Sequence, residues 1–203
     1  MIKLFGSLTS TCTRKVLTAL AETNTPFEMN LVDFAKREHK QEPHLSRQPF
    51  GQVPAIDDDG FQLYESRAIC RYLSAKAGDS LVPGDLKGRA MMDQWLSVEQ
   101  SNFSPSAMKF IYHHVFKRPQ ESAVLEAAGA MVDTTFAVLS KPLERSSFLT
   151  GEQFTIADIG YMPYVGYLMT TPVHAAVEKH PPVLAWWKRV SQRPSWVKVS
   201  AGR

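Results

Sequence analysis

The chain has 203 residues, of which 44% are hydrophobic and 21% charged, with a formal net charge of +3 at pH 7. This length and composition can bury a core and suit one domain or two small ones. A weakly basic balance without a dense Lys/Arg block does not indicate nucleic-acid binding, although it suits small anionic ligands.

Neither the start of the chain nor its cysteine content indicates export. The first residues read as a short strand, not a signal peptide, and no apolar run approaches membrane-spanning length. Cys12 and Cys70 are the only cysteines and form no Cys-x-x-Cys motif, so neither a disulfide scaffold nor a metal site is expected. We therefore expect a soluble, cytoplasmic protein without membrane association.

The first part of the chain alternates short strands with a helical pattern. Strands are predicted at residues 2–5 and 27–32, and the helix between them has an apolar stripe that includes Leu17 and Leu20. Residues 33–48 are polar and are expected to form a long loop.

Residues 49–56 read Pro-Phe-Gly-Gln-Val-Pro-Ala-Ile and start a β-hairpin. Val53 precedes a proline, so its backbone is extended and can pair with a peptide-like ligand. A strand returns at 61–64, and a helix opens at Glu65, where its first N–H groups favour an anion. A plain hairpin followed by a core helix is the alternative. The element order predicts an α/β, thioredoxin-like domain over residues 1–76.

The rest of the chain is helical in pattern after a linker of turn residues at 77–87. Residues 88–203 are therefore expected to form an all-α domain. Thr155 followed by Asp158 fits a helix-capping box. Pro194 is expected to end the last helix. One helix has an apolar stripe predicted at Val124, Ala127, Ala128, Met131, Thr135 and Val138.

The segment that joins the first strand to the first helix carries several hydroxyl side chains, which would ordinarily cap the helix. Ser10 lies four residues before Arg14, after Ile-Lys-Leu-Phe-Gly. Together with the segments 38–47, 49–54 and 65–69, this pattern resembles the phi class of the glutathione S-transferases. Weaker similarities follow in the helical part, at Trp95, Val98-Glu99, Phe103, Pro105 and 154–158.

The resemblance implies an enzyme that transfers glutathione, its co-substrate, to small hydrophobic electrophiles in detoxification. Ser10 would be the catalytic residue, donating a hydrogen bond to the glutathione sulfur. The resemblance also implies a set of glutathione-binding residues. His39 and Lys40 would bind the glycyl carboxylate, Gln52 and Val53 the cysteinyl part, and Glu65 and Ser66 the γ-glutamyl end.

The energy needed to activate the thiol is modest. Lowering a thiol pKa by about two units from about 8.5 requires roughly 2.7 kcal/mol. One charge-assisted hydrogen bond contributes roughly 1.5–3 kcal/mol. A helix N-terminus adds up to about 2 kcal/mol. The two together are sufficient, without a further base.

The electrophile is expected to bind between the two domains, which is a common place for ligand sites. Apolar and aromatic residues of the helical domain and the loop facing it are the candidates, although each taken alone is as readily a core residue. They are Phe34, Met108, Ile111, Tyr112, Tyr164, Tyr167 and Met169.

Two other functions are compatible with the sequence. Cys12 lies two residues after Ser10, where a thiolate would be stabilised, so a glutathione-dependent disulfide reductase or peroxidase is one alternative. The favoured interpretation of Cys12 is a small residue of the helix turn packed against the sheet, and Cys70, in mid-helix, is expected to be a packing residue. The other is a glutathione-binding module without catalysis. The resemblance further implies a homodimer. Phe50 supports it, since an aromatic residue in an exposed loop needs a cover.

Overall fold

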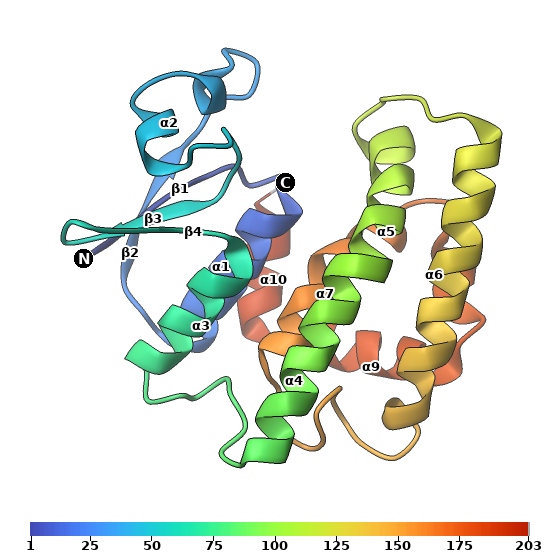
Figure 1. The fold of residues 1–203 in the computed structure, drawn as a ribbon. Coiled ribbons are helices and arrows are strands. Elements are labelled where there is room, and N and C mark those ends of the chain that lie inside the picture. Colours follow the sequence, from blue (N-terminus) through green and yellow to red (C-terminus); the bar gives the residue numbers. More distant parts are fainter. Residues whose placement is uncertain (203) are drawn as a thin grey trace. The chain divides into compact units, whose positions relative to one another are not determined.

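The computed structural model describes residues 1–202, which form two compact units (Figure 1). One unit comprises Met1–Val82 and the C-terminal stretch that starts at Pro194, and the other comprises Pro83–Arg193. The boundary between Val82 and Pro83 lies within the expected linker, residues 77–87, whereas the stretch from Pro194 belongs to the first unit and not to the helical one.

The last helix accounts for this difference. Pro194 does not end the helical part but starts α10 (Pro194–Ala201), which contacts α1 in the first unit. Trp196 and Val199 of α10 are buried. The sequence could not reveal this placement, because an amphipathic helix shows that it has a buried face but not which neighbour covers it.

The first unit contains a mixed four-stranded sheet in the order β2-β1-β3-β4. The strands are β1 (Ile2–Gly6), β2 (Phe27–Leu31), β3 (Ala55–Asp58) and β4 (Phe61–Tyr64). Strand β1 runs parallel to β2 and antiparallel to β3, which pairs antiparallel with β4. This is the predicted thioredoxin-like arrangement, and the bounds of β1, β2 and β4 are within one residue of the expected ones.

Two helices of this unit, α1 (Thr11–Glu22) and α3 (Ser66–Lys76), lie side by side (Figure 1). Their apolar faces and the sheet residues beneath them form one buried core, as predicted from the helical stripe. The fully or nearly fully buried side chains are Leu4, Val16, Leu20, Ile56, Ile69 and Leu73.

The prediction of one long loop over residues 33–48 is wrong. The segment contains a 3₁₀ turn, η1 (Glu38–Lys40), and a short helix, α2 (His44–Arg47). Local backbone hydrogen bonds form both of them, such as the one that Gln48 N donates to His44 O over 2.9 Å. The segment has too few apolar residues to show a helical period, so no pattern in the sequence predicted the 3₁₀ turn or the short helix.

The second unit is helical, as predicted. Its elements are α4 (Leu86–Val98), η2 (Glu99–Phe103), α5 (Ser104–Phe110), η3 (Ile111–Val115), α6 (Ser122–Leu143), α7 (Ile156–Leu168), α8 (His174–Glu178) and α9 (Pro181–Ser191). Every residue of α7 is buried, so this helix forms the centre of the unit.

The start of α7 is held by the predicted capping box between Thr155 and Asp158. The Asp158 carboxylate accepts hydrogen bonds from Thr155 N, from Leu149 N and from Trp186 Nε1, at 2.9–3.1 Å. Burial raises the pKa of Asp158, while these N–H donors act in the opposite direction. The carboxylate therefore joins the turn before α7 to helix α9.

The buried face of α6 agrees with the predicted stripe at Ala128 and Thr135 and differs from it elsewhere. Met131 and Val138 are 38% and 40% exposed, whereas Val132, Phe136 and Leu139 are buried. Alanine and larger apolar residues lie on several sides of this helix, so its sequence does not define a single apolar face. The 22 residues also meet the length and composition criteria for crossing a membrane, contrary to the expectation of no such run. This carries little weight by itself, because core helices of soluble proteins pass the same test.

Candidate functional site

The register of the sheet places three predicted site segments at one edge. Phe5 of β1 lies opposite Ala55 of β3, and Ala55 lies opposite Tyr64 of β4. The chain therefore leaves β1 towards Ser10, and leaves β4 towards Ser66, at the edge where it enters β3. The N-termini of α1 and α3 both start from this edge.

Ser10 is the N-cap of α1. Its backbone is extended, and its side-chain oxygen accepts a hydrogen bond from Thr13 N over 3.3 Å. A serine hydroxyl can donate one hydrogen bond and accept two, so this bond leaves the O–H available as a donor. Ser10 thus combines the ordinary capping role of a hydroxyl with the donor that a thiolate requires.

The loop that carries Ser10 is held from within the first unit. Thr13 Oγ1 accepts from Ser7 N over 3.3 Å, and buried Arg14 donates from Nε to the Leu8 carbonyl over 2.8 Å. Thr13 packs so closely on Gly6 that a Cβ at Gly6 would lie 2.7 Å from its methyl group. These contacts fix the path of the chain between β1 and the cap.

The backbone of Gln52 is held by side-chain contacts at both its N–H and its carbonyl oxygen, although its own side chain is exposed. Its N–H donates to Gln48 Oε1 over 3.0 Å, and its carbonyl oxygen lies 2.6 Å from Nε2 of His44. Both partners are buried. They orient the residue before Val53, whose peptide bond to Pro54 is cis. Sequence reasoning missed His44 and Gln48, because nothing in their spacing predicts the turn that brings them to Gln52.

His39 and Lys40 are brought to the same turn. Lys40 Nζ donates to the Phe50 carbonyl over 2.8 Å. Gly51 has φ +59°, and a Cβ there would lie 2.6 Å from the His39 carbonyl oxygen. Only glycine allows this close approach. Burial lowers the pKa of His39, and the neighbouring positive charges, that of Lys40 first, act in the same direction.

Glu65 and Ser66 form an unusual helix start. Glu65 has φ +70°, which is costly for a residue with a side chain, and its side chain does not cap α3. Ser66 is 2% exposed, and its buried hydroxyl has no hydrogen-bond partner among the described residues. Buried hydroxyls in folded proteins are nearly always paired. This arrangement therefore fits a ligand group that completes the bond.

The candidates for the electrophile pocket fall into two groups. Ile111, Tyr164 and Tyr167 are buried in the helical unit, where Tyr164 contacts Phe103 and Tyr167 contacts Phe116. Their role there is packing. The half-buried or exposed candidates, which can still contact a ligand, are Phe34, Met108, Tyr112 and Met169.

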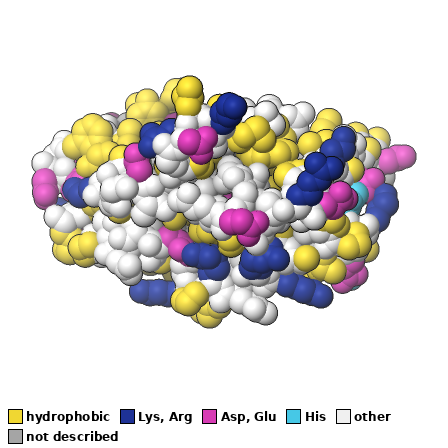
Figure 2. All heavy atoms as spheres, turned by 90° about the horizontal axis from the view of Figure 1, so that it is seen from below, with side chains coloured by type: hydrophobic (Ala, Val, Ile, Leu, Met, Phe, Trp, Pro, Cys, Tyr) yellow, Lys and Arg dark blue, Asp and Glu magenta, His cyan; other side chains and the backbone are white. Residues whose placement is uncertain are grey.

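The two cysteines differ in their surroundings. Cys12 is half-buried in the first turn of α1, and Cys70 is buried in α3, as expected for a packing residue. Within residues 1–202, no group of three or more His, Cys, Asp or Glu side chains could hold a metal ion. Figure 2 shows Lys and Arg side chains in several separate groups with other side-chain types between them.

Comparison with known proteins gives a consistent result. Residues 1–75 match the glutathione S-transferase N-terminal domain, and residues 103–194 match the C-terminal domain of the same family. Glutathione S-transferase F12 of Arabidopsis thaliana is 36% identical over 98% of this chain and 97% of its own length. Glutathione S-transferase PARB of Nicotiana tabacum is also 36% identical, over 97% of this chain and 96% of its own.

Solved structures of glutathione transferases have the same fold as this chain. Glutathione transferase F7 from Populus trichocarpa superposes with a TM-score of 0.94 at 33% identity, covering 100% of this chain and 99% of its own. Maize glutathione S-transferase I in complex with an atrazine glutathione conjugate superposes with a TM-score of 0.92 at 31% identity, covering 99% of this chain and 97% of its own. This chain belongs to the glutathione S-transferase family, in its phi class, and is an enzyme that transfers glutathione to electrophiles.

Proposed function

We propose that Ser10 activates the glutathione sulfur in this enzyme and that the edge of the sheet described above binds the tripeptide. The observation that carries the proposal is the buried, unpaired hydroxyl of Ser66 at a helix N-terminus, on the same sheet edge as Ser10. The Ser66 hydroxyl can accept or donate a hydrogen bond to a ligand. The Ser10 hydroxyl, at the same sheet edge, still has its O–H available as a donor.

The proposed chemistry needs only a hydrogen bond and a helix field. The Ser10 O–H donates to the sulfur and favours the thiolate, while Thr13 N–H holds the Ser10 oxygen in place. The N-terminus of α1 adds a positive potential. The thiol proton passes to solvent water, and the thiolate attacks the electrophilic carbon, forming a carbon–sulfur bond as the leaving group departs with the electron pair of its own bond.

The ends of the tripeptide would be held by opposite parts of the site. The backbone of Val53 offers an N–H and a C=O to the cysteinyl part, and Gln52 flanks it with its exposed side chain. His39 and Lys40 would bind the glycyl carboxylate. Glu65 and Ser66 would bind the γ-glutamyl end at the start of α3.

The electrophile would contact the exposed and half-buried members of the predicted pocket, namely Phe34, Met108, Tyr112 and Met169. Methionine side chains are flexible and polarizable, so this lining favours tolerance of different apolar electrophiles over sharp selectivity. The Phe34 ring already contacts His39 edge-on, with centroids 4.7 Å apart, which would place it beside the bound tripeptide.

A rate comparison tests the function. We expect the purified chain to conjugate glutathione to 1-chloro-2,4-dinitrobenzene, the Ser10→Ala variant to lose most of that rate, and Cys12→Ser to keep it. The reverse pattern, with Cys12→Ser inactive and Ser10→Ala active, would contradict the proposal and favour thiol-exchange chemistry at Cys12.

We also propose a cytoplasmic homodimer. Phe50 is 65% exposed and contacts Tyr64 edge-on, so its own unit leaves most of the ring uncovered. The loop that presents Phe50 also presents Gln52 and Val53, so a partner that covers Phe50 would stabilise the glutathione site.

Sedimentation tests the assembly. We expect a dimer at micromolar concentration, and Phe50→Ser should weaken both association and glutathione affinity. Phe61→Ser is a matched control, since Phe61 is an aromatic residue of the same unit that is 50% exposed. A wild-type monomer that binds glutathione normally would contradict the dimer and leave the proposed chemistry intact.

A further inference from the structure

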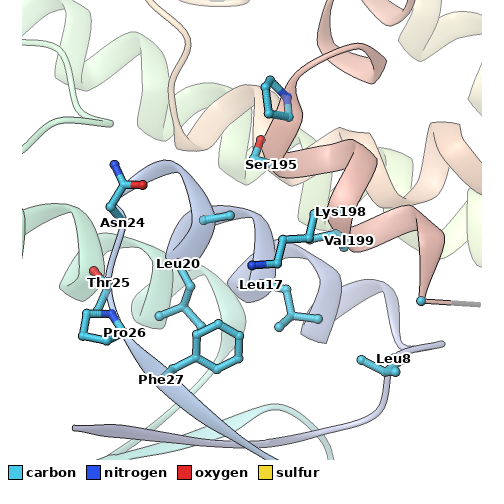
Figure 3. A pocket seen from close by; sticks show the side chains of 13 residues that line it. Leu8, Leu17, Leu20, Asn24, Thr25, Pro26, Phe27, Ser195, Lys198 and Val199 are labelled. Atoms are coloured by element: carbon cyan, nitrogen blue, oxygen red, sulfur yellow. The ribbon is translucent and has the colours of Figure 1, made fainter.

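Helix α10 and the residue that follows it contact the first unit near both ends of α1. At the end of α1, Ser195 Oγ donates a hydrogen bond to the Glu22 carboxylate. Near the start of α1, Gly202 lies against the turn that leads to Ser10, since a Cβ at Gly202 would be 3.6 Å from Leu8 Cδ1. Figure 3 shows Ser195 at one end of α10 and Leu8 beside the other. The proposed function gives α10 no role.

Leu8 belongs to the turn that carries the Ser10 hydroxyl. Ser10 N donates to the Ser7 carbonyl oxygen over 3.0 Å and closes this turn. Arg14 Nε donates to the Leu8 carbonyl over 2.8 Å, so α1 holds the backbone of the turn. The half-buried Leu8 side chain is supported from the other side, by the end of α10. A catalytic group must be held to about 0.5 Å, so both supports bear on the direction of the Ser10 O–H.

The packing between α1 and α10 is incomplete away from these two contacts. A cavity of about 630 Å³ borders both of them, and Leu17 of α1 and Val199 of α10 line it (Figure 3). Protein interiors are normally close-packed, and a void deprives the side chains around it of contacts. The position of α10 therefore depends on the buried Trp196 ring and on the contacts at the two ends of α1.

We propose that α10 is a positioning element for the catalytic serine and acts through Leu8. With α10 held at Glu22, its far end supports the Leu8 side chain, and the turn keeps the Ser10 O–H directed at the glutathione sulfur. When α10 loosens, Ser10 still caps α1 but donates less well to the sulfur. The thiol pKa then rises while the tripeptide stays bound, because α10 contains none of the residues proposed to bind it. The inference rests on the proposed role of Ser10.

Two variants weaken this support from opposite ends. Ser195→Ala removes the bond to Glu22, which lies at the other end of α1 from Ser10, about 18 Å away for a helix of this length. Leu8→Ala removes the side chain that the far end of α10 contacts. Each should raise the pKa of the bound glutathione thiol by about half a unit, which lowers the thiolate fraction below that pKa about threefold.

The affinity for S-methylglutathione, which has no thiol, should stay at the wild-type value in both variants. Thiolate absorbance as a function of pH measures the thiol pKa, calorimetric titration measures the affinity, and the thermal unfolding midpoint reports whether the fold is kept. A role in stability alone would lower the unfolding midpoint without changing the thiol pKa.

Ser200→Ala is the matched control. Ser200 is a serine of the same helix, and its hydroxyl bonds within α10, to the Val197 carbonyl over 3.2 Å. Its loss should leave the thiol pKa unchanged. The double variant of Leu8→Ala and Ser195→Ala tests the route between the two ends. Because α10 acts through Leu8, the double variant should shift the thiol pKa no further than Leu8→Ala alone.

An unchanged thiol pKa in Ser195→Ala or in Leu8→Ala would overturn the proposal, and so would additive shifts in the double variant. Ser10→Ala, measured alongside, separates this failure from failure of the proposed function. If Ser10→Ala raises the thiol pKa and the other two variants do not, Ser10 keeps its role and α10 has none in positioning it. If Ser10→Ala leaves the thiol pKa unchanged, both proposals are overturned.

Discussion

Two helices of the first unit begin at the same sheet edge with a serine, and the two serines differ. Ser10 caps α1, and its oxygen already accepts a hydrogen bond from Thr13 N. Ser66 is buried in the first turn of α3 and has no partner among the described residues. The Ser10 oxygen therefore has a partner within the protein, whereas the Ser66 hydroxyl has none, and we propose that a ligand supplies it. Stability and binding should therefore respond differently at these two positions.

The largest effect is expected at Ser10. Ser10→Ala should raise the pKa of the bound glutathione thiol by about one to two units, which lowers the thiolate fraction and the rate at neutral pH by about 3- to 25-fold. Glutathione affinity should change little. Loss of the cap should also destabilise the protein by about 1 kcal/mol. Thiolate absorbance as a function of pH measures the first effect, and urea unfolding the second.

Ser7→Ala is the matched control for that experiment, since Ser7 lies in the same loop and caps nothing. An unchanged thiol pKa in Ser10→Ala would remove Ser10 from the mechanism. A loss of affinity with intact turnover would assign it a binding role instead.

Ser66→Ala should show the opposite combination. Glutathione affinity should fall about tenfold, because a hydrogen bond to a charged ligand group is lost. The stability of the free protein should stay the same or rise, since an unpaired buried hydroxyl is removed. Calorimetric titration and urea unfolding on the same sample give both values.

Ser74 provides the control for Ser66. It is buried in the same helix, and its Oγ accepts a hydrogen bond from Leu81 N over 3.0 Å. Ser74→Ala should lower stability and leave glutathione affinity unchanged. If Ser66→Ala were destabilising to the same degree as Ser74→Ala, the hydroxyl of Ser66 would have a structural partner and not a ligand.

A smaller effect is expected at Lys40. Lys40→Ala should weaken glutathione binding about twofold to fivefold at low salt, as an exposed ion pair allows. The difference from wild type should shrink above physiological ionic strength, because salt screens exposed charges. Lys36→Ala is the control in the same loop. A difference that does not depend on salt would show that Lys40 acts by holding Phe50 and not through its charge.

The smallest effect is a pH dependence at His39. Its pKa is lowered in the free protein, and a carboxylate bound beside it would raise that pKa, so binding takes up a proton between the two values. The affinity for S-methylglutathione, which has no thiol, should therefore rise about twofold as pH falls from 7 through the His39 pKa. His39→Asn should remove this rise. An identical pH profile in the variant would exclude His39 from the carboxylate site.

The sequence determined much of the first unit. Local patterns predicted three of the strands to within one residue, and they predicted a helix on each side of the hairpin segment, because each of these features depends on neighbours in the chain. The capping box of Thr155 and Asp158 is local in the same way. The resemblance to phi-class transferases rested mainly on Ser10 with Arg14 and on the segments 38–47, 49–54 and 65–69, and the family comparison confirmed it.

Only the tertiary structure decided which distant groups meet. The placement of α10 on α1 depends on packing between two segments that lie more than a hundred residues apart in the sequence. The contacts of His44 and Gln48 with the Gln52 backbone depend on a turn that no periodic pattern in the sequence predicts. The buried face of α6 was predicted only in part, because a helix with apolar residues on several sides has no single apolar stripe in its sequence. Local conformation follows from nearby residues, whereas contacts between distant elements follow from how their surfaces pack together.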